Sequence, residues 1–360
     1  MAQIDMAQGR PYLEPRTCFA TFFAAAVLRF PFPVMVGDIG GTNLRIALSR
    51  APGEAPAMIL KERTAAYPDL SAALAAAAKR SGVKPRSVVV CAAGPVEGAS
   101  VRLTNADWSI DGRAVAKDLG LDQGLLLNDF EAQAVALPHL TDGMTREIAP
   151  GKAHVDAPML VLGPGTGLGA AGLLRADGRW LVATTEAGHM DFGPVDADED
   201  MFWPHLQRVE GRVTFESVLS GPGLARLDAA LRAARGLDLT GADAAGVEAA
   251  AREGDLVALE AIRRFWRLVG RCAGDLALVF LARGGVTLAG GVLPRLLDWL
   301  DERDFRLAFK AKAPMQALLA DIPVRLIVHD DAALAGMAAL AAAPEKYAID
   351  YSGRAWRPLA

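Results

Sequence analysis

The residues that could do chemistry gather in short glycine-rich segments, and the first of these is GDIGGTN at residues 37–43. Glycines without a Cβ let backbone N–H groups close around phosphate oxygens, and Thr42 and Asn43 can donate further hydrogen bonds. The carboxylate of Asp38 can hold a metal ion or its waters. The segment matches neither the P-loop nor the dinucleotide-binding pattern. We therefore interpret it as a phosphate-binding turn between two strands, with a purely structural hairpin as the alternative.

A second segment repeats this plan at residues 159–174, MLVLGPGTGLGAAGLL. An apolar strand leads into a glycine-rich turn that carries Thr166, and another apolar strand follows. Two copies of one device predict an internal duplication in which each half offers a hairpin to one end of a polyphosphate.

A carboxylate stands where a predicted strand gives way to a helix. The apolar residues 125–127 are followed by Asn128 and Asp129, and an amphipathic run then occupies residues 131–137. Ligands usually dock at the carboxyl ends of strands in α/β sheets, so this carboxylate can face a cleft. The alternative is that Asn128 or Asp129 only caps the helix. One of the pair can cap while the other faces the ligand.

Further polar residues are typical of contacts to a hydroxylated ligand. Residues 104–108, TNADW, offer an amide and a carboxylate beside an aromatic wall, or else form a plain loop with a partly buried tryptophan. Two glycines at the end of a predicted strand, Gly290 and Gly291, would let an adenine or ribose lie close to the backbone.

Glu186 and His189 follow a predicted strand and fall in a loop. We interpret them as an acceptor and a donor for a polyhydroxylated ligand. Zinc is the alternative, for which Asp191 and His205 are the further candidates at short range.

Length and composition favour a globular protein of two domains, since the chain has 360 residues, 52% of them hydrophobic and 22% charged. A net charge of −4 with scattered charges argues against nucleic acid as the main ligand. The three cysteines are far apart and show no CxxC spacing, which predicts neither disulfides nor a cysteine zinc site. We expect a cytosolic protein that does not bind membranes.

Residues 1–33 are interpreted as a poorly ordered leader. Their apolar stretch at residues 18–28 resembles the core of a signal peptide, but it is too short to span a bilayer. A chain that starts at Met35, directly before the first turn, is a further alternative.

The predicted elements alternate in the manner of an α/β fold. Besides the strands of the two turns, we expect strands at residues 58–64, 88–93, 125–127, 180–185, 286–289 and 324–328. We expect helices at residues 70–80, 109–119, 131–137, 224–235, 256–282 and 332–343, and a hinge at residues 141–151.

Taken together, these motifs resemble those of the bacterial glucokinases of the hexokinase, actin and Hsp70 superfamily. The segments GDIGGTN, LTNADW, LNDF, GPGTGLG, EAGH, FESVLSGPGL and LAGGV occur in the family's order between residues 34 and 343. The resemblance implies an α/β fold made of two ribonuclease-H-like halves around a central cleft. The small lobe would span residues 34–140 and be completed by residues 331–360, and the large lobe would span residues 141–330.

The resemblance also implies the activity and the site. The family transfers the γ-phosphoryl group of ATP to glucose with Mg²⁺, at the entry to glycolysis, and a homodimer is implied as well. Asp129 would be the catalytic base, and Asp38 would hold Mg²⁺ through Mg-ATP. The glucose ligands implied are Asn105, Asn128, Asp129, Glu186, His189 and Glu216. The ATP ligands implied are Gly37, Asp38, Ile39, Gly40, Gly41, Thr42, Asn43, Gly165, Thr166, Gly167, Gly290 and Gly291.

Two alternatives remain at this point. The chain could phosphorylate another hexose, such as fructose or mannose, or it could be a sugar-sensing regulator without turnover. Related regulators and kinases carry a CxCGxxGC zinc cluster, which this sequence lacks.

Overall fold

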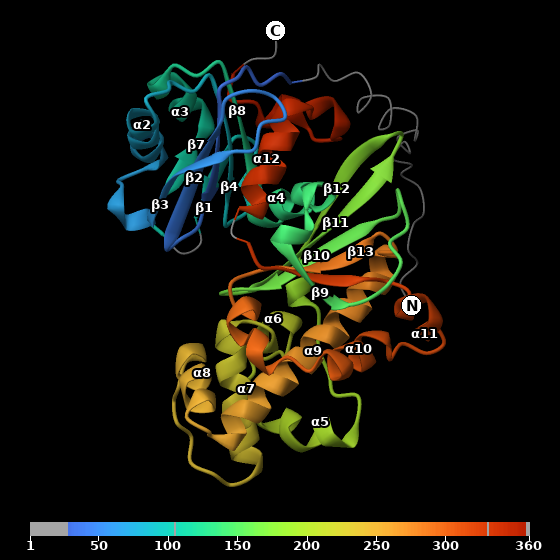
Figure 1. The fold of residues 1–360 in the computed structure, drawn as a ribbon. Coiled ribbons are helices and arrows are strands. Elements are labelled where there is room, and N and C mark those ends of the chain that lie inside the picture. The colour runs from blue at the N-terminus through green and yellow to red at the C-terminus, as the bar shows by residue number, and fades with distance from the viewer. Residues whose placement is uncertain (1–27, 104–105, 330, 358–360) are drawn as a thin grey trace, which may run out of the picture.

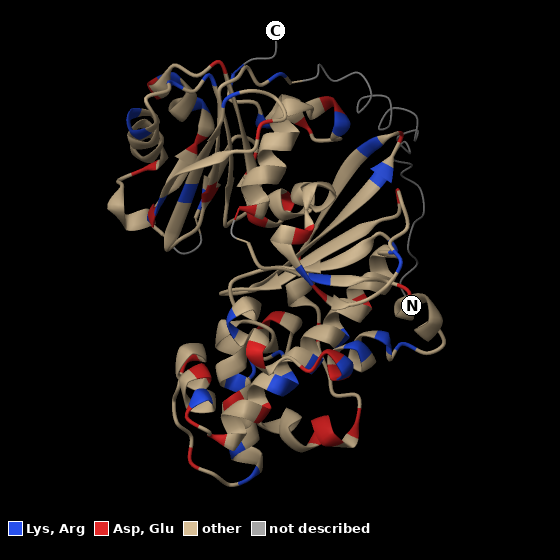
Figure 2. Cartoon of the chain, viewed as in Figure 1, with Lys and Arg blue, Asp and Glu red and all other residues tan. Residues whose placement is uncertain are grey.

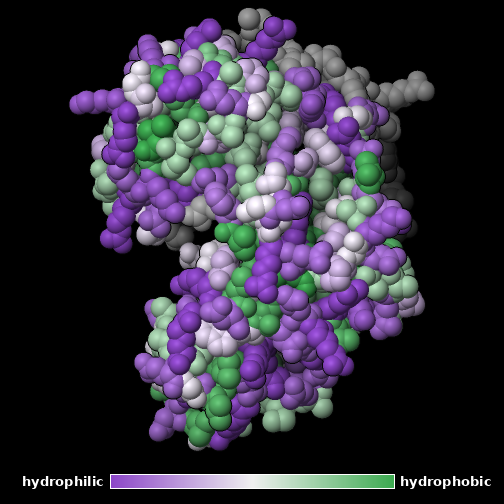
Figure 3. Space-filling view, viewed as in Figure 1, coloured by the Kyte–Doolittle hydropathy of each residue, from purple (hydrophilic) through white to green (hydrophobic). Residues whose placement is uncertain are grey.

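The computed structural model describes residues 28–103, 106–329 and 331–357. They form two lobes, each built on one main β-sheet (Figure 1). Acidic and basic residues are scattered along both lobes (Figure 2). The surface is hollowed between the lobes (Figure 3). None of the helices in the described ranges is long and apolar enough to cross a bilayer.

The small lobe contains a sheet in the order β3-β2-β1-β4-β8. Its strands are β1 (Val34–Ile39), β2 (Asn43–Ser49), β3 (Ala57–Arg63), β4 (Ser87–Ala92) and β8 (Gln123–Asn128). The first three form an antiparallel meander, and β4 and β8 run parallel to β1. On one face lie α2 (Leu70–Ser81) and α3 (Gly112–Leu119), with the short strands β5 (Val96–Glu97), β6 (Ser100–Arg102) and β7 (Ser109–Asp111) beside them.

The large lobe repeats this plan in the order β12-β11-β10-β13-β14, with β9 added antiparallel at the edge. Its strands are β9 (Thr145–Ala149), β10 (Met159–Pro164), β11 (Leu168–Ala176), β12 (Arg179–Thr185), β13 (Gly285–Leu288) and β14 (Val324–Ile327). Again an antiparallel meander is followed by two strands parallel to the first. The predicted duplication and the actin-like architecture are therefore confirmed.

Helices of the large lobe pack around a core centred on the long helix α9 (Figure 1). They are α5 (Ala197–Phe202), α6 (Phe215–Val218), α7 (Gly221–Ala234), α8 (Ala244–Arg252), α9 (Leu256–Phe280), α10 (Glu302–Lys310) and α11 (Gln316–Ala320).

Two helices lie between the sheets, α4 (Asp129–Ala136) and α12 (Ala332–Ala342). Their alanines and Gly336 allow close packing, since a Cβ on Gly336 would lie 2.5 Å from the Cα of Ala136. Ala132 and Val135 of α4 belong to the core cluster of the small sheet, whereas Ala134 packs on the large sheet. Because α4 touches both sheets, its position depends on both lobes.

Several predicted features differ from the structure. The predicted leader is wrong for residues 28–33, because Leu28 and Phe30 are buried in the core; residues 1–27 lie outside the described ranges. The helix expected from residue 109 begins at Gly112, since the preceding residues form β7 and Asp111 caps the helix. The expected hinge at residues 141–151 contains a 3-10 helix at Asp142–Met144 and the strand β9, which pairs with β14.

Trp108 was expected either as an aromatic wall or as a partly buried loop residue. It is 8% exposed and belongs to the apolar core of the small lobe. The aromatic-wall interpretation is therefore wrong, because the ring serves packing.

Candidate active site

The first glycine-rich turn is shorter than its sequence indicates. Strand β1 continues through Gly37 and Asp38 to Ile39, so that residues 40–42 alone make the turn. The Gly40 N–H donates to the Asn43 carbonyl at 2.9 Å, and the Thr64 hydroxyl donates to the Gly40 carbonyl at 2.6 Å. These bonds fix a turn whose remaining N–H groups can face a ligand.

The second turn is held from two sides. Across the turn, the Gly165 N–H donates to the Gly167 carbonyl at 2.7 Å, and the Gly165 carbonyl accepts from the Gly221 N–H at 2.8 Å. Gly221 is the first residue of α7, whose N-cap is Ser220. The second turn therefore lies against the N-terminus of a helix, where backbone N–H groups and the helix dipole favour anions.

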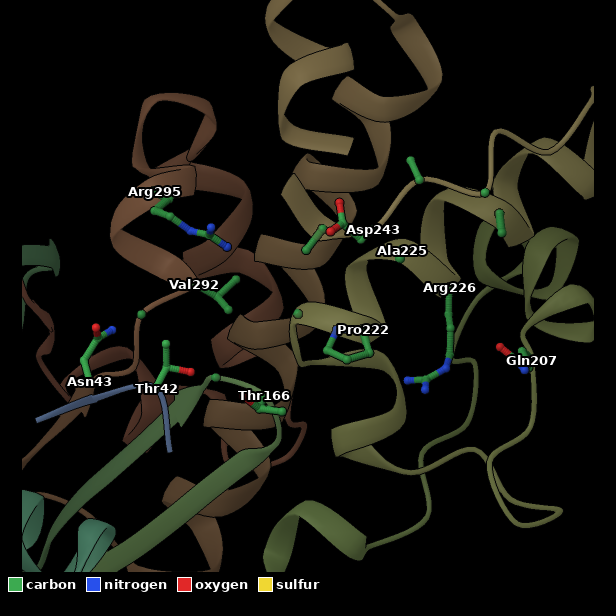
Figure 4. Close-up of a pocket in the computed structure, with 17 residues that line it drawn as sticks. Thr42, Asn43, Thr166, Gln207, Pro222, Ala225, Arg226, Asp243, Val292 and Arg295 are labelled. Atoms are coloured by element: carbon green, nitrogen blue, oxygen red, sulfur yellow. The ribbon is translucent and has the colours of Figure 1, made fainter. Parts of the chain in front are cut away.

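Both turns line one cavity of about 930 Å³. Thr42 and Asn43 come from the small lobe, and Gly165, Thr166 and Gly291 from the large lobe. Figure 4 shows Thr42 and Asn43 beside Thr166 at one side of this cavity. The two glycine-rich turns therefore line one shared cavity, as we expected from the sequence.

Other residues of this cavity escaped the sequence analysis. Two of them are cationic: Arg226 lies on α7, and Arg295 follows β13. The third, Asp243, is acidic and directly precedes α8. A usable signal was present: Ser220 followed by a glycine and a proline is typical of a helix start. We expected this helix only at residues 224–235, whereas α7 begins at Gly221.

Asn128 and Asp129 occupy the start of α4. Asn128 is the N-cap, and its side-chain oxygen accepts from the Phe130 N–H at 2.9 Å. Its amide donates to the Gly94 carbonyl at 3.1 Å, and its own N–H donates to Glu131 at 2.9 Å. Both side-chain groups of Asn128 thus have protein partners, which favours a capping role for this residue.

The carboxylate of Asp129 is half-buried at the boundary of the lobes. Burial, followed by the nearby charge of Asp38, raises the pKa of Asp129 to about 6. The next residue, Phe130, packs on Gly169 of β11, where a Cβ would overlap its ring. Asp129 of the small lobe is therefore held close to the large lobe. With a pKa of about 6, its carboxyl group gains or loses a proton close to neutral pH.

Asp38 lies near the end of β1, the central strand of the small sheet, opposite Arg45 on β2 and Cys91 on β4. Arg45 Nη1 is 3.8 Å from its carboxylate, and the Cys91 thiol donates to it at 3.5 Å. Because Asp38 and Asp129 are close enough for one charge to raise the other's pKa, the space near them favours a cation.

Three of the candidate sugar ligands, Glu186, His189 and Glu216, lie in the large lobe. His189 ends a 3-10 helix at Ala187–His189, and its Nε2 is 3.9 Å from the exposed carboxylate of Glu186. Glu216 on α6 accepts from the Leu168 N–H at 2.9 Å. His189, Glu216 and Thr166 line a second cavity of about 270 Å³. Asn105 lies outside the described residues.

Comparison with known proteins gives a consistent result. The sequence model of the family described as Glucokinase matches residues 35–344. The glucokinase of Rhizobium meliloti (strain 1021) is 42% identical over 331 residues, which are 91% of this chain and 97% of that protein. The glucokinase of Brucella suis biovar 1 (strain 1330) is 41% identical over 334 residues, 91% of this chain and 96% of that protein.

Solved structures agree with these relatives. A glucokinase from an Antarctic psychrotroph has a TM-score of 0.78 at 32% identity and covers 86% of this chain and 98% of its own. A ROK family glucokinase from Streptomyces griseus, solved in complex with glucose and AMPPNP, shares the fold with a TM-score of 0.58 at 22% identity. That match covers 86% of this chain and 99% of the Streptomyces chain.

Proposed function

Since this chain belongs to the glucokinase family, we propose that it transfers the γ-phosphoryl group of ATP to the 6-hydroxyl of glucose. The products are ADP and glucose 6-phosphate, which places the reaction at the entry to glycolysis. The observation that carries the proposal is the cavity shared by the two turns, one from each lobe. A donor with several phosphates can contact two backbone cradles at once only if both line one space, as these two turns do.

ATP would bind along this cavity. The turns at residues 40–42 and 165–167 would hold the phosphates, and the N-terminus of α7 would add N–H donors beside Gly165. Gly290 and Gly291 would lie against the adenosine. Arg226 and Arg295, which also line the cavity, add positive charge for a polyanionic ligand.

Asp129 would act as the base. Phosphoryl transfer passes through a loose transition state, so the protein mainly aligns donor and acceptor and stabilises charge. A carboxylate with a pKa of about 6 is mostly ionised at neutral pH and still basic enough to take the proton of the sugar hydroxyl. The two lobes would exclude water from the transferred group.

Mg²⁺ would accompany ATP, and the residues present fit it. Asp38 supplies a hard carboxylate ligand, or an acceptor for metal-bound water, close to a second carboxylate. When bound, the ion neutralises charge on the phosphate oxygens. Asp38 is held in place from two neighbouring strands, by Arg45 and Cys91.

Glucose would bind between Asp129 and the large lobe, with Asn105, Asn128, Glu186, His189 and Glu216 as its proposed ligands. Recognition would depend on acceptors that stay unpaired when an epimer of the sugar binds. The contact of Glu216 with the Leu168 N–H ties sugar recognition to the second turn.

The proposal for Glu186 can be tested by the substitution Glu186→Gln. The charged acceptor becomes a neutral amide on an exposed side chain, so the fold should be unaffected. We expect the KM for glucose to rise at least tenfold while the KM for ATP stays within twofold. Steady-state kinetics with each substrate varied in turn measures both constants. Equal changes in both would contradict a role on the sugar side.

The activity itself is tested by an assay that couples ADP release to NADH oxidation. Glucose, fructose, mannose and N-acetylglucosamine are offered separately with Mg-ATP. We expect kcat/KM to be highest for glucose. Comparable turnover of fructose or mannose would indicate a broader hexose kinase, and binding of glucose without ADP release would indicate a regulator.

The family resemblance also supports a homodimer in the cytoplasm. Sedimentation velocity of the purified protein measures the oligomeric state, and cell fractionation measures the location.

A further inference from the structure

The last described stretch of the chain, residues 344–357, contacts both lobes and is named the C-terminal segment here. It begins on the large lobe, beside β12. Arg179 donates to the carbonyls of Glu345 and Tyr347, each at 3.0 Å. The Ala348 N–H donates to the Trp180 carbonyl at 2.7 Å. The segment is therefore attached to the large sheet before it reaches the small lobe.

Its far end is built into the small lobe. Trp356 is 2% exposed and fills space next to Gly112 and Gly124, where a Cβ would overlap the indole ring. The Trp356 and Arg357 N–H groups both donate to the side-chain oxygen of Gln123 at 3.0 Å. Because Gln123 opens β8, the segment is fixed to the strand that leads to Asp129.

Between these attachments lies the short helix α13 (Tyr351–Arg354), whose Arg354 contacts helix α4. Arg354 Nη1 lies 2.8 Å from both carboxylate oxygens of Glu131. Glu131 is 6% exposed, and its Oε2 also accepts the Asn128 N–H at 2.9 Å. Arg354 thus provides the counter-charge for a buried carboxylate that caps the first turn of α4.

We propose that Arg354 is a positioning residue for the phosphoryl transfer, acting through Glu131 on the first turn of α4 and so on Asp129. This inference rests on the proposed function, in which Asp129 is the base. The C-terminal segment then belongs to the catalytic apparatus, although it lies more than 200 residues along the chain from the base; Arg354 and Glu131 are separated by 223 residues.

The physical reason is the cost of a buried charge without a partner. If Arg354 is removed, the buried carboxylate of Glu131 loses its counter-charge and is expected to turn toward water. The bond to the Asn128 N–H then weakens, and the turn that carries Asp129 loses its fixed geometry. Displacements of about 1 Å at a reacting group can lower a rate by about 100-fold.

The test compares kcat and KM for Arg354→Met with those of the wild type. We expect kcat to fall at least tenfold, while the KM for ATP stays within twofold because the two turns are untouched. Arg354→Lys should recover most of kcat, because a single nitrogen, Nη1, makes both contacts and an ammonium group can replace it.

A matched control is Arg86→Met, which breaks another Arg–carboxylate pair in the same lobe. Arg86 Nη2 lies 2.6 Å from Asp122, and both side chains are about half exposed. The kcat of this control should stay within twofold of the wild type.

The double variant Arg354→Met with Glu131→Gln tests the route through Glu131. A neutral amide needs no counter-charge and can still accept the Asn128 N–H. We therefore expect the double variant to fold even if Arg354→Met alone does not, with a kcat within threefold of Glu131→Gln alone.

Two results would overturn the inference. The first is a wild-type kcat in Arg354→Met. The second is that Arg354→Met lowers kcat by the same factor in the Glu131→Gln background as in the wild-type background. In both cases the wild-type protein still phosphorylates its sugar, so the proposed function stands. Failure of the proposed function would instead appear as a wild-type protein that releases no ADP with any sugar.

Discussion

Asp129→Asn is expected to lower kcat by about 10²–10⁴-fold, the usual contribution of a positioned general base. An amide cannot take the proton of the sugar hydroxyl, but it has nearly the same size and shape. The Asn oxygen can still accept the Phe130 N–H, as Asp129 does at 2.9 Å. We therefore expect glucose and ATP to bind within a fewfold of wild-type affinity. Steady-state kinetics and calorimetric titration with glucose measure the two effects.

The pH dependence of kcat provides a control for this variant. Since the pKa of Asp129 is about 6, the wild-type kcat should fall about tenfold per pH unit below that value. The residual kcat of Asp129→Asn should lack this fall. Turnover near the wild-type rate, or an unchanged acid limb, would remove Asp129 from the catalytic role.

The same carboxyl should affect stability. Burial raises its pKa from 3.8 to about 6, so the folded protein binds the proton more tightly than the unfolded chain. Stability therefore falls as pH rises between these two values and stays reduced above pH 6. A shift of this size corresponds to about 3 kcal/mol. Asp129→Asn should accordingly unfold at a higher denaturant concentration than the wild type at pH 8, and this advantage should disappear near pH 4.

Gly290→Ala is expected to destabilise the protein by about 3 kcal/mol or more and to raise the KM for ATP at least tenfold. Gly290 has a φ of +85°, which an alanine adopts only with strain, and an added Cβ would overlap the Pro164 carbonyl. Pro164 ends β10 directly before the second turn. Relief of the overlap must therefore move the turn that is proposed to hold the phosphates. Urea unfolding and ATP-dependent kinetics measure the two effects.

The control Gly53→Ala separates the effect of backbone strain at a positive φ from the effect of steric overlap with the added Cβ. Gly53 has a similar φ of +81°, but a Cβ there meets nothing within 4 Å. This control should lose only about 1–2 kcal/mol and keep the KM for ATP. If the two variants lose equal stability and both keep their KM for ATP, the close approach of Gly290 to Pro164 does not support the second turn.

Local patterns in the sequence were sufficient to identify the repeated plan of the two halves. Each glycine turn lies between apolar strands, and the elements after it alternate, which is the pattern that the two sheets share. The position of Asp129 at a strand end is likewise a local fact, because a buried strand and a capped helix meet there. Motifs of this kind depend on neighbours within a few residues, so they can be recognised without coordinates.

Other features depend on residues far apart in the chain. The extension of β1 through Asp38 depends on pairing with Arg45 and Cys91, and the burial of Trp108 depends on the small-lobe core. Likewise, no local pattern indicates that Arg226 and Arg295 line one cavity.

The sequence by itself thus determined the family, the duplication and most residues proposed for the site, because these are carried by short motifs. The tertiary structure decided which side chains lie close to each other. It raised the pKa of Asp129 through burial and the charge of Asp38, and it brought Arg354 to Glu131 across 223 residues. Burial and charge pairing are properties of the packed chain, since they depend on atoms that only folding brings into contact.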